Sequence, residues 1–160
     1  MGKNCQIDKL DVSIMTELQK DARVSFQDLA RQMTVSGGTI HVRYNKLKDA
    51  GVVKGVRLLV DTNLLGYQIC AFIGLNLHNA GDYKKVLEKL KQMPEVIEAH
   101  YTTGPYSLFI KVLAKNTQDL HRFLVERLQA LSEIQSTETL ISLDIPIDRP
   151  PNLGSVETID

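Results

Sequence analysis

Residues 36–51 read SGGTIHVRYNKLKDAG, and this stretch decides how the first part of the chain folds. Its apolar residues recur at the spacing of one helical face: Ile40, Tyr44 and Leu47. Ser36 is a favourable N-cap, and Gly51 is the residue type that commonly follows a helix. The stretch therefore predicts a helix that opens at Ser36 and ends near Ala50.

The flanking residues extend this pattern in both directions. Residues 8–20 carry apolar residues at i, i+4 and i+8, and residues 25–33 carry a second apolar stripe, so each predicts a helix. A break follows at Thr34 and Val35. Downstream, Val52-Val53 and Val56 to Val60 flank Lys54-Gly55, which predicts a small hairpin. Three short helices and a hairpin predict a winged helix-turn-helix domain over residues 1–60.

A different rhythm follows the expected linker at residues 61–66. Strands are expected at 67–77, 96–102, 107–114 and 133–143, and helices at 81–93 and 117–131. This β-α-β-β-α-β order predicts a ferredoxin-like α+β domain over residues 67–145, with both helices on one face of an antiparallel sheet. Self-association is the simplest cover for the other face. Residues 146–160 are expected to form a surface arm or a frayed tail.

Charge is distributed unevenly, although the net charge of the 160 residues is zero. Residues 1–60 hold ten Lys or Arg and six Asp or Glu, whereas residues 61–160 hold nine and thirteen. The net +4 and −4 favour contact between the first part and a polyanion.

Several classes of protein are disfavoured by composition and motifs. The apolar runs are too short for a membrane span, and the N-terminus lacks a signal-peptide core. Cys5 and Cys70 cannot build a disulfide framework, and both are expected to be reduced thiols in a cytosolic protein. The four histidines lack metal-ligand spacing, and no nucleophile motif, P-loop or dinucleotide fingerprint is present. The chain is therefore expected to be neither an enzyme nor a metalloprotein.

The first candidate site is the start of the helix that opens at Ser36. Small residues there let the backbone approach DNA, free N–H groups can bind phosphate, and an arginine can pair with guanine. The candidate DNA contacts on this helix are Ser36, Gly37, Gly38, Thr39, His41 and Arg43. The candidate phosphate contacts that flank them are Arg31, Lys46, Lys48, Lys54 and Arg57. The alternative is an ordinary capped helix with a solvated basic side.

The second candidate site joins the polar turn at residues 101–107 to the polar stretch at residues 135–139. Polar side chains at a half-buried edge need partners, and a small zwitterion supplies both charges. Backbone N–H groups around Gly104 can hold a carboxylate, and Glu138 can hold an amine. A hydrogen-bonded subunit interface without ligand is the equally weighted alternative.

Taken together, these stretches resemble the Lrp/AsnC family of bacterial and archaeal transcription regulators. The resemblance covers residues 7–145 and rests on an ordered set of short motifs. These are Ile7-Asp8-Lys9-Leu10-Asp11, Leu29-Ala30, the Val35-Ser36 to Val52 spacing, Thr103-Gly104 with Tyr106, and the last strand. Residues 101–107 and 133–142 are most similar to the asparagine-responsive branch of the family, with Ser107 where many members have Asp.

The resemblance implies a transcription regulator with a RAM- or ACT-like second domain, acting in the cytoplasm on nucleoid DNA. It implies dimers that close into an octameric ring, with an amino acid bound between dimers. The effector residues carried over are Tyr101, Thr103, Gly104, Tyr106, Ser107, Gln135, Thr137 and Glu138. Asparagine is the expected effector, with leucine or methionine as alternatives. A DNA-organising protein without ligand control and a regulatory subunit of an enzyme are the competing functions.

Overall fold

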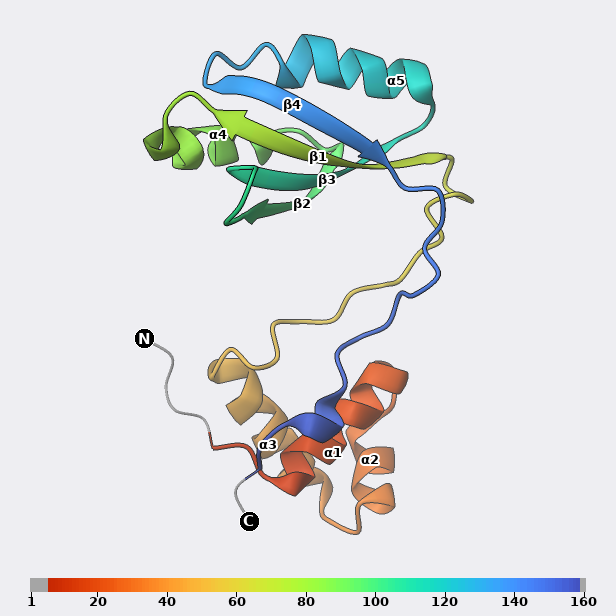
Figure 1. Cartoon of the computed structure of the whole chain (residues 1–160). Helices are drawn as coiled ribbons and strands as arrows, with labels where there is room; N and C mark the ends of the chain where they lie inside the picture. Colours follow the sequence, from red (N-terminus) through yellow and green to blue (C-terminus); the bar gives the residue numbers. More distant parts are fainter. Residues whose placement is uncertain (1–5, 159–160) are drawn as a thin grey trace. The chain divides into compact units, whose positions relative to one another are not determined.

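The computed structural model describes residues 6–158, which form two compact units (Figure 1). Unit 1 comprises residues 6–59 and 147–158, and unit 2 comprises residues 60–146. Cys5 lies outside the described residues. Cys70 is a half-buried free thiol on the first strand of unit 2, and burial raises its pKa.

Unit 1 contains three helices whose starts are fixed by side-chain caps. They are α1 (Lys9–Lys20), α2 (Phe26–Gln32) and α3 (Gly37–Asp49), capped by Asp8, Ser25 and Ser36. Each cap side chain accepts a backbone N–H three residues on, as favoured N-cap residues do. The buried core between the helices is Ile14, Leu29, Ala30 and Ile40. The three helices predicted from apolar periodicity are confirmed.

The turn between α2 and α3 contains a strained residue. Thr34 has a φ of 56°, a left-handed conformation that a β-branched side chain rarely adopts. Its backbone N–H bonds Arg31 O, and the next N–H, of Val35, bonds Ala30 O at 3.0 Å. These bonds hold the tight turn that sets α3 against α2.

The hairpin predicted after α3 is wrong for this chain. Residues 53–60 run extended without forming a strand, and Leu58 and Leu59 are 87% and 88% exposed. An isolated two-stranded hairpin is marginal without a surface to pack on. No residue of this segment belongs to the buried core of unit 1, so its alternating apolar residues have no surface to pack against.

Residues 147–158, part of the expected surface arm or tail, are grouped with unit 1. They contain the short helix η3 (Leu153–Ser155), which lies beside α1. Asn152 caps this turn through a 2.9 Å bond from the Gly154 N–H, and Gln19 on α1 donates to Pro151 O. Leu153 is half-buried and gives the segment an apolar contact, which its proline-rich sequence did not indicate.

Unit 2 is a four-stranded antiparallel sheet in the order β2-β3-β1-β4. Its elements are β1 (Ile69–Leu77), η1 (Ala80–Asp82), α4 (Tyr83–Leu90), β2 (Val96–Tyr101), β3 (Leu108–Ala114), α5 (Thr117–Arg122), η2 (Phe123–Leu128) and β4 (Ile134–Ile141). The predicted βαββαβ order is confirmed. The helix predicted over residues 117–131 changes within its length, since η2 has the wider π-helical turn.

The two faces of this sheet have different surroundings. Ile73, Leu75 and Ile110 point to the face that packs against α4, α5 and η2, together with Val86 and Phe123. The alternate residues, which include Phe72, Gly74 and Phe109, lie on the opposite face, called here the open face. No helix among residues 6–158 is long and apolar enough to cross a membrane.

Candidate DNA-binding and effector sites

The backbone at the start of α3 is covered by few side chains. Ser36 Oγ accepts the Thr39 N–H at 3.1 Å and lies 2.9 Å from Thr39 Oγ1. A Cβ placed on Gly37 would meet no atom within 4 Å, and one on Gly38 would meet only Ser36 Oγ at 3.7 Å. A phosphate or a base edge can therefore approach the N-terminal N–H groups of α3 closely.

The exposed stripe of α3 comprises Gly38, His41, Val42 and Asn45. Val42 is 69% exposed, which is unusual for an apolar residue in the middle of a helix. Asn45 Nδ2 lies 3.1 Å from His41 Nδ1, so the two polar side chains occupy one ridge. Val42 and Asn45 were not among the residues predicted from the sequence to contact DNA. Val42 is four residues after Gly38, and Asn45 is four residues after His41, and this i, i+4 spacing was the available signal.

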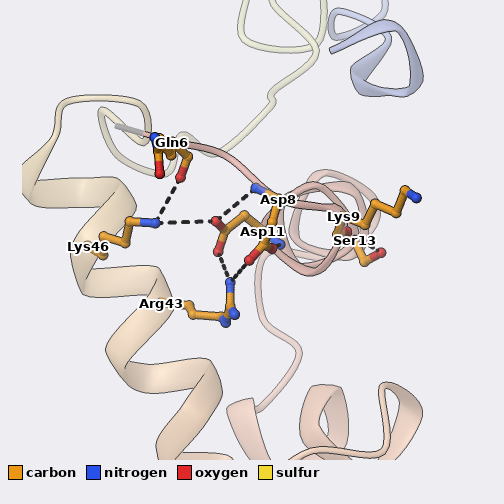
Figure 2. Close-up of polar contacts among 7 residues, drawn as sticks. All are labelled: Gln6, Asp8, Lys9, Asp11, Ser13, Arg43 and Lys46. Atoms are coloured by element: carbon orange, nitrogen blue, oxygen red, sulfur yellow. Dashed lines mark hydrogen bonds and ion pairs between the residues drawn. The ribbon is translucent and has the colours of Figure 1, made fainter. Parts of the chain in front are cut away.

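Arg43 and Lys46 form polar contacts within unit 1, and Figure 2 shows both reaching from α3 to the start of α1. Arg43 Nη1 lies 2.5 Å from Asp8 Oδ2 and 3.0 Å from Asp11 Oδ1. Lys46 Nζ donates to Gln6 O at 2.8 Å and lies 3.7 Å from Asp11 Oδ2. Asp11 is fully buried, and its carboxylate is the centre of the group.

The guanidinium of Arg43, which the sequence predicts to read guanine, joins α3 to α1 in this structure, and its contact with DNA stays a prediction. Only 29% of its side chain is exposed, and withdrawing it would leave the buried Asp11 carboxylate without this partner. Asp8 and Asp11 also form a reciprocal capping box. Burial would raise the pKa of Asp8, but hydrogen bonds from the Asp11 N–H and from Arg43 hold it below the usual value.

The other basic candidates lie on exposed surfaces. Arg31 is on α2, paired with Asp28 at 3.0 Å, and Lys48 is near the end of α3. Lys54 and Arg57 are exposed on the extended segment that follows α3. None of these four is enclosed, so each can move to meet a phosphate.

In unit 2, Tyr106 and Glu138 form the clearest polar contact of the second candidate site. The Tyr106 hydroxyl donates to Glu138 Oε2, and this hydrogen bond raises the pKa of the phenol. Tyr106 precedes β3, whereas Glu138 is on β4, so the ring reaches across β1. Both side chains lie on the open face, because Glu138 pairs with Gly74 and Gly74 pairs with Phe109.

Other predicted effector residues face the helices. Tyr101 pairs with the buried Leu108, and its ring stacks on Tyr83 of α4 with centroids 4.5 Å apart. Thr137 pairs with Leu75 and receives a 3.3 Å bond from Gln129, at the end of η2. One chain therefore divides the predicted effector cluster between the two faces of its sheet.

The turn at residues 102–107 is held by its own hydrogen bonds. Thr102 Oγ1 donates to Tyr106 O at 2.8 Å, and the Ser107 N–H donates to Leu75 O at 2.9 Å. Gly104 has a φ of 111°, which favours glycine. Thr103 and Gly104 are exposed at the tip, and Gln135 is exposed at the irregular start of β4.

Two cavities of about 530 and 310 Å³ lie beside α5, and neither is lined by a predicted effector residue. Within the described part of the chain, no group of three or more His, Cys, Asp or Glu side chains is placed to hold a metal.

A helix-turn-helix unit with an open recognition helix, joined to a separate α+β unit, defines a class of DNA-binding regulators. The AsnC-type helix-turn-helix domain matches residues 7–48, and the Lrp/AsnC ligand binding domain matches residues 70–152. The chain belongs to the Lrp/AsnC family of DNA-binding transcription regulators.

Relatives within the family are similar over almost their whole length. Regulatory protein AsnC of Haemophilus influenzae is 48% identical over 143 residues, which is 89% of this chain and 95% of that protein. Regulatory protein AsnC of Escherichia coli K12 is 48% identical over 147 residues, with 92% and 97% covered.

Solved structures agree in fold. The structure of E. coli AsnC matches with a TM-score of 0.86 and 47% identity, covering 91% of this chain and 97% of that one. A transcriptional regulator from Neisseria meningitidis, solved as a complex with L-methionine, matches with a TM-score of 0.84 and 21% identity, covering 90% and 94%. The second likeness shows that the fold is shared.

Proposed function

We propose that this regulator binds a specific DNA sequence through α3 and responds to a small amino acid, with asparagine as the first choice. The observation that carries the DNA-binding site is the open start of α3, where two glycines and a ridge of exposed side chains adjoin free backbone N–H groups. It acts on DNA of the cytoplasm, without catalysis of its own.

The residues of the exposed stripe of α3 contact the base edges. The Asn45 amide suits a bidentate contact with adenine, and the Val42 methyl groups suit the methyl group of thymine. His41 supplies a second polar edge on the same ridge. Ser36 and Thr39 hold the helix start, while Gly37 and Gly38 admit the DNA backbone.

Phosphate contacts fall to the exposed cations Arg31, Lys48, Lys54 and Arg57. Such contacts add affinity for any sequence, and each released counterion steepens the salt dependence. Arg43 and Lys46 contribute by orienting α3.

The DNA-binding proposal is tested by selecting sites from random duplexes and measuring binding by gel shift. Asn45→Ala is expected to weaken the selected site by about 1–3 kcal/mol at one base position, whereas Arg31→Ala lowers the salt slope by about 1 for all sequences. Asn79→Ala in unit 2 is the matched control. Failure to form any sequence-specific complex at moderate salt contradicts the proposal.

The assembly proposed is a two-fold dimer that closes into an octameric ring. The open face of the unit 2 sheet supports this, since Phe72, Phe109 and the 49% exposed Leu140 lie on it. Two-fold dimers predict palindromic half-sites about 34–36 Å apart. Sedimentation velocity measures the assembly, and a monomer at micromolar concentration would contradict it.

The effector site is proposed to be completed by neighbouring copies of the chain. Its residues lie on both faces of one sheet, and neither of the two cavities described above lies among them. The turn around Thr103, Gly104 and Ser107 offers N–H groups and hydroxyls for a carboxylate, and Glu138 offers a carboxylate for an ammonium group. The 48% identity to regulatory protein AsnC favours asparagine.

Thermal melting against each of the twenty amino acids tests the effector. A ligand at 100 times its Kd adds about 2.7 kcal/mol to the folded state, so a selective rise with asparagine is expected. A rise with leucine or methionine alone would replace asparagine as effector. If none of the twenty amino acids changes the melting temperature, the result would favour a DNA-organising protein without ligand control.

A further inference from the structure

Gly74 lies in the middle of β1 at a position where a side chain has no room. A Cβ placed on it would lie 2.5 Å from Tyr106 Cδ1 and 2.6 Å from both Cε1 and Cγ of the same ring. Carbon atoms in proteins do not approach so closely without a shift. Gly74 has no positive φ, so the ring rather than the backbone conformation requires glycine here.

The ring that fills this place joins three strands. Gly74 pairs with Phe109 of β3 on one side and with Glu138 of β4 on the other. Tyr106 lies across β1 between them, with its centroid 5.9 Å from that of Phe109 and its hydroxyl on Glu138. Its aromatic surface takes the place of the missing Gly74 side chain on the open face.

We propose that Gly74 is a positioning residue of the effector site: it gives the Tyr106 ring its place on β1 and thereby fixes the Glu138 carboxylate that receives the effector's ammonium group. The part that concerns the effector's ammonium group rests on the proposed function as an amino-acid sensor. A methyl group at position 74 displaces the ring, breaks the hydrogen bond to Glu138 and leaves that carboxylate free to rotate. Gly74 acts through Tyr106 and touches no effector atom.

Melting of the full chain tests the steric part without any effector. Gly74→Ala is expected to lower Tm by about 5 °C or more, because the methyl group overpacks the site. In a Tyr106→Ala background the same change is expected to leave Tm unchanged or raise it, since alanine suits a strand interior better than glycine. Gly81→Ala, where a Cβ meets no atom within 4 Å, is the control. An equal loss of Tm in both backgrounds overturns the proposal.

Calorimetry with asparagine tests the positioning part. Gly74→Ala is expected to weaken binding at least about tenfold, and Gly81→Ala is expected to leave it unchanged. Tyr106→Phe, which keeps the ring but loses the hydroxyl, is expected to weaken binding in the same direction. Unchanged affinity in Gly74→Ala overturns the positioning role.

The wild-type titration separates this proposal from the proposed function. If the wild type binds none of the twenty amino acids, sensing itself fails, and with it the effector role of Gly74. The reversal of the melting effect in the Tyr106→Ala background then still decides whether Gly74 positions Tyr106. A failure confined to Gly74→Ala, with a wild type that binds asparagine, contradicts this proposal alone.

Discussion

Asp11 is the enclosed charge on which two helices depend. Its carboxylate is fully buried and is contacted by Arg43 and Lys46 of α3, while its side chain also caps α1. Removing one partner of a buried ion pair strongly destabilises a protein, because the remaining charge stays buried without an opposite charge beside it. The orientation of α3 therefore depends on one acidic residue of α1.

Asp11→Asn is expected to lower the free energy of unfolding by about 2 kcal/mol, since a charged hydrogen-bond partner of a half-buried arginine is lost. Urea unfolding of the full chain measures this change. Asp28→Asn, whose pair with Arg31 is exposed, is the matched control and is expected to stay within about 0.5 kcal/mol. Equal effects of the two variants would contradict a positioning role for Asp11.

Thr34 offers the opposite change, because its left-handed φ of 56° is strained for a β-branched residue. Thr34→Gly is expected to raise the free energy of unfolding by about 1 kcal/mol, as the relief of strain exceeds the added freedom of the unfolded chain. Gly51→Ala, at a φ of 77°, is expected to lower it. Destabilisation by Thr34→Gly would show that its side chain, not its backbone, matters at the turn.

The partners of these residues could not be predicted from the sequence. The period of the α3 stretch predicted a helix and its caps correctly, but the contacts of Arg43 within unit 1 were not predicted, because a polar helical face does not reveal its partner. Asp11 is 32 residues away in the sequence, and Tyr106 is equally far from both Gly74 and Glu138. Only the folded chain brings such pairs together.

At the scale of elements, the start of β4 is tied to α4 by a carboxylate with two lysines. Glu133 is buried, and its oxygens lie 2.5 Å from Lys85 Nζ and 2.8 Å from Lys89 Nζ. Hydrogen bonds from Lys85 and Lys89 lower the pKa of Glu133 from 4.5 to about 2. The ionised form is therefore favoured by folding.

Because the folded-state pKa is depressed, this contribution to stability is complete above about pH 4.5 and is lost as the pH falls toward 2. Glu133→Gln is expected to lower stability at pH 7 and to flatten its dependence on pH between 4.5 and 2. Melting curves across this range measure both effects. Glu88→Gln, in an exposed pair with Lys91, should keep the wild-type slope.

Periodicity predicted elements with a buried face and failed for those without one. The order of strands and helices in unit 2 followed from alternation and turn residues, because each strand packs a face on α4 or α5. The same alternation at residues 56–60 predicted a hairpin, yet pairing needs a partner that the single chain does not supply. Alternation reports a tendency to extend, not the presence of a neighbour.

At the scale of the whole molecule, unit 2 is inserted between two parts of unit 1. A chain ending at residue 146 is expected to keep the unit 2 sheet and to lower the melting temperature of unit 1, because η3 no longer covers α1. Hydrogen exchange resolves the two units separately. Equal protection of α1 in both chains would contradict a stabilising role for η3, and loss of protection in β1 would contradict the independence of unit 2.

The return of residues 147–158 to unit 1 has a consequence for synthesis on the ribosome. Residues 60–146 are translated before the segment that contains η3, so the whole ligand-binding unit emerges while the helix-turn-helix unit still lacks its last piece. Domains generally fold as units during translation. The sheet can thus fold, and can begin to meet other nascent copies on the same messenger RNA, before the DNA-binding head is finished.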